Sequence, residues 1–79
     1  MELWIRSQDR ESLKIVKEIH YTENKEKHYI GNGYDYYGIY KSKQRALEVL
    51  DEIVAHIENN WNVAIQTVYD MPKEWYKWR

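Results

Sequence analysis

One segment of this chain carries the periodicity of a long helix, and the rest of the sequence has to be arranged around it. From position 42 to position 60, apolar side chains recur every three to four residues and form one stripe: Ala46, Leu47, Leu50, Ile53, Val54 and Ile57. Ser42 is a good N-cap, because its hydroxyl accepts from a free amide of the first turn. Asn59-Asn60 is typical of a helix end. We expect one amphipathic helix of about 16 residues, roughly 24 Å long.

Short alternating segments before and after this helix predict strands. They are separated by polar or glycine-containing turns and cover residues 2–8, 13–21, 28–30, 34–41 and 63–69. Gly38 lies inside the fourth segment and predicts a bulge there. The order is then ββββαβ. We therefore expect an α+β fold: a mostly antiparallel sheet of about five short strands, with one amphipathic helix on one face.

The second face of such a sheet has no helix to cover it. We expect Leu3, Ile5 and Ser7 to point toward the helix. The other face would carry Trp4, Arg6, Gln8, Lys14, Val16 and His20. This mixture is too apolar for water and too polar for a core. It is typical of a subunit interface or a ligand platform, unless residues 73–79 fold back over it.

The small size of the chain makes extra stabilisation important. Its 79 residues make one domain, which we place at residues 1–72, followed by an aromatic C-terminal tail at 73–79. Domains of this size bury only about 60–65% of their unfolded surface and often depend on disulfides, a metal or a partner subunit. Cysteine is absent, and the histidines are too widely separated for a metal site. With no metal or cofactor expected, we predict self-association into a homo-oligomer.

The aromatic and charged residues narrow the class of partner. All 12 aromatic residues are Trp or Tyr, which concentrate at interfaces and ligand sites, although β-propensity alone also explains tyrosines on a half-buried sheet. The net charge of −1 argues against DNA as a partner. No apolar run is long enough to cross a membrane and no signal peptide is visible, so we expect no membrane association and a cytoplasmic location.

The first predicted strand carries the best candidate for a ligand site. Arg6 and Gln8 lie two residues apart and should share a face, so that their donors converge. Arginine is the bidentate partner of phosphate, and glutamine can pair with a base edge or a ribose. Trp4 or Tyr36 would stack on a base, and Lys14 would add positive charge. The alternative is an Arg6 in a surface ion pair and a Gln8 that caps the following turn.

Catalytic groups with suitable neighbours are not visible. The three serines lie in no catalytic motif: Ser7, Ser12 and Ser42. The run Gly31-Asn32-Gly33 lacks the lysine and the following helix of a phosphate-binding loop. Glu48 and Asp51 lie one turn apart on the solvent side of the helix and have no neighbouring histidine. We therefore expect a binding protein and not an enzyme, and a small hydrolase is the least favoured alternative.

Four segments together resemble small proteins of phages and prophages of Firmicutes: Trp4–Asp9, Gly38–Lys43, Arg45–Ile53 and Tyr69–Pro72. The arrangement is similar to that of the viral sponge proteins that inhibit bacterial Thoeris and CBASS defence. The resemblance implies a phage anti-defence protein that forms homo-oligomers in the host bacterial cytoplasm. It would sequester a cyclic nucleotide or cyclic ADP-ribose-type signal without cleaving it. The alternative is an interaction module that docks on a host defence protein through its aromatic face and tail and inhibits it.

Overall fold

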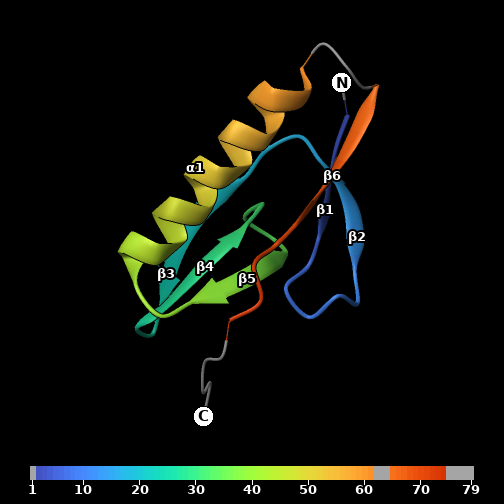
Figure 1. Cartoon of the computed structure of the whole chain (residues 1–79). Coiled ribbons are helices and arrows are strands. Elements are labelled where there is room, and N and C mark those ends of the chain that lie inside the picture. Colours follow the sequence, from blue (N-terminus) through green and yellow to red (C-terminus); the bar gives the residue numbers. More distant parts are fainter. Residues whose placement is uncertain (1, 62–64, 75–79) are drawn as a thin grey trace.

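The computed structural model describes residues 2–61 and 65–74 (Figure 1). Their elements follow in the order β1 (Glu2–Arg6), β2 (Leu13–Val16), β3 (His20–Asn24), β4 (Lys27–Gly31), β5 (Tyr36–Tyr40), α1 (Lys43–Asn60) and β6 (Gln66–Asp70). The predicted α+β class, with mostly antiparallel strands and one helix between the last two, is confirmed for these residues.

The strands form two sheets where the sequence predicted one. Sheet A has the order β2-β1-β6 and sheet B the order β3-β4-β5. The segment predicted as one strand at 13–21 is divided, because β2 belongs to sheet A and β3 to sheet B. All pairs are antiparallel except β1 with β6, which run parallel. Six strands thus replace about five.

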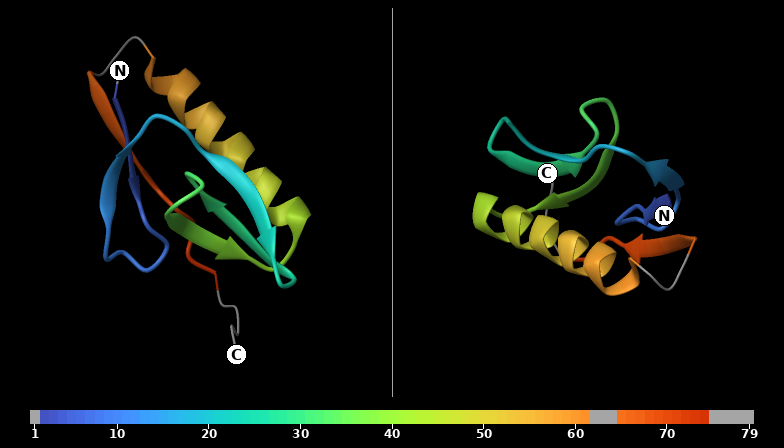
Figure 2. Two further views of the ribbon diagram at one scale, coloured as in Figure 1. Left: turned by 180° about the vertical axis from the view of Figure 1, so that it is seen from behind. Right: turned by 90° about the horizontal axis from the view of Figure 1, so that it is seen from above.

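The core lies between the two sheets and the helix. It consists of Leu3, Ile5, Val16, Ile30, Tyr37, Tyr40, Ala46, Val49, Ile53 and Met71. Figure 2 shows α1 and sheet B on the same side of sheet A. Two small sheets that face a common helix enclose apolar side chains from three directions, which one flat sheet with one helix cannot do. No helix or strand of the described residues lies on the other side of sheet A.

The register of sheet A confirms one predicted face and corrects another. Leu3 and its neighbours at 5 and 7 point into the core as expected, each 9% exposed or less. On β2, Val16 pairs with Leu3 and is buried, and Lys14 points to the same side. Ile15 pairs with Trp4 and stays 41% exposed. The prediction that placed Val16 and Lys14 beside Trp4 was therefore wrong, because directly opposite residues share a face.

The helix begins as predicted and buries a narrower stripe than predicted. The Ser42 hydroxyl accepts from the amide of Arg45 at 3.0 Å, which confirms the N-cap. Val49 is buried, while Leu47 and Val54 are 40% and 52% exposed. These two side chains lie outside the buried stripe because α1 contacts mainly sheet B and β6. The Asn pair forms the last two residues of α1, as predicted, and the C-cap residue at position 61 is right-handed (φ −52°).

The pairing of β4 with β5 contains a bulge next to Gly38, the glycine at which the sequence predicted one. Ile30 pairs with Gly38 and Gly31 with Tyr36, so Tyr37 is the extra residue on β5. Gly38 has a packing role as well: a Cβ at this position would lie 2.7 Å from the hydroxyl oxygen of Tyr40. The bulge turns the Tyr37 side chain into the core, where it is 4% exposed.

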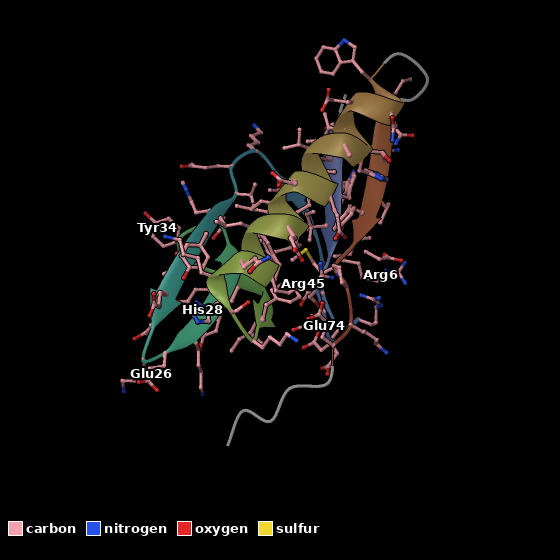
Figure 3. The ribbon with its side chains drawn as sticks, turned by 60° about the vertical axis from the view of Figure 1, so that its left-hand side comes forward. Arg6, Glu26, His28, Tyr34, Arg45 and Glu74 are labelled. Carbon is pink, nitrogen blue, oxygen red and sulfur yellow. The ribbon has the colours of Figure 1, made fainter. Side chains whose placement is uncertain are left out.

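The residues after β6 are held firmly against the domain. The Met71 amide donates to the Arg6 carbonyl at 3.0 Å, and the Met71 side chain is fully buried. Arg45 forms an ion pair with Glu74, and the two side chains lie near each other in Figure 3. Most of the predicted aromatic tail, residues 75–79, lies outside the described residues, as do residues 62–64 of the predicted last strand.

Candidate functional site

The five residues predicted to form a ligand site lie in different places. Trp4 and Arg6 are on the open side of sheet A, where Arg6 projects away from the helix (Figure 3). Gln8 and Tyr36 line a cleft between the loop after β1 and strand β5. Lys14 bonds to Asp35, the residue before Tyr36. The structure therefore brings Gln8 and Tyr36 together and does not bring the donors of Arg6 and Gln8 to one point.

Gln8 is occupied by the backbone of its neighbours. Its amide nitrogen donates to the carbonyls of Ile39 and Pro72, both at 3.1 Å, and its amide oxygen accepts from Ile39 N at 3.0 Å. The Gln8 backbone N–H donates to the carbonyl of Tyr37 at 2.7 Å. Gln8 therefore connects the loop after β1 to β5 and to the C-terminal segment. What it can offer a ligand is mainly the second lone pair of its oxygen.

Ser7 and Asp9, not Gln8, stabilise the turn at residues 7–12. The Ser7 hydroxyl donates to Asp9 at 2.6 Å and accepts from the Ser12 amide at 3.0 Å. Asp9 also accepts from the Glu11 amide at 2.9 Å. These hydrogen bonds, that from Ser7 first, hold the pKa of Asp9 below its usual value. The turn thus presents an ionised, pre-positioned carboxylate at the cleft.

We call the cleft itself the tyrosine cleft. It has a volume of about 200 Å³ and is lined by Ser7, Gln8, Asp9, Tyr29, Tyr36, Tyr37, Gly38 and Ile39. The rings of Tyr29 and Tyr36 stack with centroids 4.1 Å apart and planes inclined by 18°. Tyr36 keeps 49% of its surface exposed. Since pockets for whole ligands usually measure about 300–1,000 Å³, this cleft fits one planar group such as a nucleobase.

The charges around the tyrosine cleft have both signs. Lys14 Nζ lies 2.7 Å from Asp35, and this contact raises the pKa of Lys14. Asp9 contributes a carboxylate to the lining. Such a site accepts hydrogen bonds from base N–H groups or sugar hydroxyls more readily than it binds phosphate. A phosphate would have to displace Asp35 from Lys14.

The open side of sheet A forms a second surface, which we call the outer face. It carries the side chains of Glu2, Trp4, Arg6, Leu13, Ile15, Gln66, Val68 and Asp70. Arg6 forms an exposed ion pair with Asp70 at 3.4 Å, which agrees with the alternative that the sequence left open. Sequence reasoning missed Leu13, Ile15 and Val68, although alternation along their strands was a usable signal.

A larger cavity of about 410 Å³ lies near the C-terminal end of α1. It is lined by Glu2, Leu3, Ile15, Val16, Lys17, Glu18, Ile19, Ile57 and Trp61. Most of these side chains are apolar, and the stacked aromatic pair of the tyrosine cleft has no counterpart among them. This cavity adjoins the outer face, with which it shares Glu2 and Ile15.

The histidines take part in local hydrogen bonds. His28 bonds to Tyr21 and His56 to Thr67, both at 2.7 Å. His20 bonds to Glu18 at 2.8 Å. Within residues 2–61 and 65–74, no group of three His, Asp or Glu side chains is placed to hold a metal ion. No helix in the same ranges is both long and apolar enough to cross a bilayer.

Comparison with known proteins yields no match to a family model, a curated protein or a solved structure. The resemblance to viral sponge proteins therefore stays a prediction.

Proposed function

We propose that this protein binds a cyclic nucleotide-type signal without cleaving it, with one base held in the tyrosine cleft. The observation that carries the proposal is the stacking of Tyr29 on Tyr36, whose side chain stands half exposed beside a polar rim. An exposed aromatic plane is the usual platform for a base in proteins that bind nucleic acid components. Sequestration of an immune signal by a phage protein is the biological role that fits such an activity.

Polar contacts would come from the rim of the cleft. The Asp9 carboxylate, held in place by Ser7, accepts from a base amino group or a ribose hydroxyl. Lys14 binds the phosphate after releasing Asp35. The Lys14 and Asp35 side chains are both about half exposed, so their ion pair can open. Of the five residues predicted as ligand contacts, Tyr36 and Lys14 therefore remain in the proposed site. Gln8 has a mainly structural role. Trp4 and Arg6 belong to the outer face.

A catalytic role is not part of the proposal. The serine hydroxyl on the polar rim, that of Ser7, donates to Asp9, and its residue is 6% exposed. Nucleophilic catalysis requires a base within hydrogen-bond reach and an accessible reacting atom. The described lining of the cleft does not offer the two together, so the ligand should leave chemically unchanged.

Calorimetric titration with a panel of cyclic dinucleotides, cyclic trinucleotides and cyclic ADP-ribose tests the proposal. Binding of at least one compound in the micromolar range or tighter is expected. The bound compound should be recovered intact after denaturation of the protein. The absence of heat and of chemical-shift changes with every compound at micromolar protein would overturn it.

Three variants locate the site. Tyr36→Ala should weaken binding by about five- to hundredfold, the range for loss of one stacked base. Tyr36→Phe keeps the ring and should stay within about threefold of the parent. Tyr34→Ala is the matched control, because Tyr34 is 94% exposed and lies outside the cleft lining. Equal binding by the two alanine variants would place the ligand elsewhere.

A further inference from the structure

The outer face has an apolar row through its centre. Ile15 pairs with Trp4 and Trp4 with Val68, so these side chains stand side by side across β2, β1 and β6. Ile15 and Val68 are 41% and 45% exposed, and the Trp4 indole is oriented by a 3.0 Å hydrogen bond to Gln66. Figure 2 shows α1 and sheet B on the opposite side of sheet A. Within the described chain, this row has no covering helix or strand.

Charges of opposite sign flank the row along β1. Glu2 lies two residues before Trp4 and Arg6 two residues after it, and all three belong to the same face. The central strand therefore carries an acid, an aromatic ring and a base at equal spacings of about 7 Å. Two copies can face each other across these surfaces and be related by a 180° rotation about an axis parallel to the apolar row. This rotation reverses the direction of β1 in the second copy. Such a rotation places Glu2 of one copy opposite Arg6 of another.

We propose that the outer face binds the outer face of a second copy of this chain, with the two-fold axis along the row Ile15–Trp4–Val68. Each apolar side chain then meets its own equivalent, which is the defining property of an isologous interface. Two Glu2–Arg6 pairs form, one on each side of the axis. Face-to-face sheets lie about 10 Å apart, a gap that a glutamate and an arginine together can span.

The area of the face determines how tight this dimer is. Three strands spaced about 4.8 Å apart, of four residues in β2 and five in β1 and β6, give a patch of roughly 14 by 17 Å at most. Side-chain relief enlarges it, yet it stays below the roughly 800 Å² per partner of a standard interface. We therefore expect a weak, concentration-dependent dimer with a dissociation constant in the micromolar range or above. The proposal concerns self-association and is independent of the ligand.

Sedimentation equilibrium from micromolar to millimolar chain concentration tests the dimer. Val68→Lys places a charge on the apolar row and should raise the dissociation constant by at least about tenfold. Val54→Lys is the matched control: Val54 is also an exposed valine, at 52% against 45%, but it lies on α1. This control should dimerise like the parent. Circular dichroism confirms that both variants are folded.

A charge exchange tests the orientation. Arg6→Glu alone would place a carboxylate opposite Glu2 of the other copy on both sides of the axis, and it should weaken the dimer by about tenfold. The double variant Glu2→Arg, Arg6→Glu restores opposite charges across the axis. Both charge variants are made in an Asp70→Asn background, because Asp70 pairs with Arg6 and would repel a second carboxylate at position 6, and the double variant should return to within about threefold of that background. A monomer at millimolar concentration would overturn the proposal. So would a dimer that the Val68 change leaves intact, or one that the double variant fails to restore.

Discussion

The side-chain amide of Gln8 pairs with the backbone of Ile39 as a neighbouring strand would. Ile39 N donates to the amide oxygen at 3.0 Å, and the amide nitrogen donates to the Ile39 carbonyl at 3.1 Å. Ile39 lies on β5 of sheet B, whereas Gln8 follows β1 of sheet A. One side chain thus supplies to β5 the hydrogen bonds that a continuous sheet would have supplied.

Removal of this contact should destabilise the whole domain. Gln8→Ala leaves the N–H and carbonyl of Ile39 and the carbonyl of Pro72 without the amide, and part-buried groups of this kind cost about 1–3 kcal/mol each at most. We expect a loss of about 2–3 kcal/mol in the free energy of unfolding, measured with urea. Gln44→Ala on the exposed side of α1 is the control and should change it by less than about 0.5 kcal/mol.

Gly38 should not tolerate a side chain. A Cβ there would lie 2.7 Å from the hydroxyl oxygen of Tyr40 and 3.0 Å from the Met71 methyl carbon. Both neighbours are fully buried and cannot swing into solvent. Gly38→Ala should therefore lower the free energy of unfolding by about 1–3 kcal/mol, the usual cost of overpacking. A thermal melt measures the loss, and an unchanged melting temperature would show that the packing relaxes freely.

Alkaline pH should destabilise the protein through Tyr40. Burial, and then the charge of Glu74, raise the pKa of Tyr40 well above its usual value of 10.0. The unfolded chain ionises first, so stability is complete below pH 10 and falls as the pH rises from there toward the folded pKa. The slope from this group is at most about 1.4 kcal/mol per pH unit.

Tyr40→Phe tests this assignment. It removes the titrating group and should flatten the loss of stability between about pH 10 and 11, measured by urea unfolding at each pH. At neutral pH the variant loses the 3.3 Å hydrogen bond to Pro72, a cost of about 1 kcal/mol. An identical alkaline slope in both proteins would assign the effect to other groups, such as Tyr69, whose pKa is also raised by burial.

Low pH should reduce the stability of the folded protein by protonating Asp9 in the turn at residues 7–12. The hydrogen bonds from Ser7 and the Glu11 amide lower the pKa of Asp9 below 3.8, so ionised Asp9 stabilises the folded turn at pH values above that. This contribution is lost as the pH falls through the folded pKa. Asp9→Asn should be less stable than the parent at pH 6, and the difference should shrink below about pH 4. Thermal melts across this range give the comparison.

Local patterns in the sequence determined the elements of this fold and part of their orientation. The 3.6-residue period and the Ser42 cap located the helix, and alternation along β1 turned Leu3 and Ile5 inward. These features follow from the backbone geometry of one segment and need no partner. The bulge beside Gly38 was predictable for the same reason.

Contacts between distant segments were decided only by the tertiary structure. Residues 13–21 alternate except at Val16 and Lys17, and this local break did not show that the chain leaves sheet A after Val16 and enters sheet B at His20. The side of β2 that faces the core follows from its pairing with β1, and the role of Gln8 from its approach to Ile39. The alternation of apolar and polar residues divides the side chains of a strand between two faces. Which face is buried depends on the strand beside it, because a shift of one residue exchanges them.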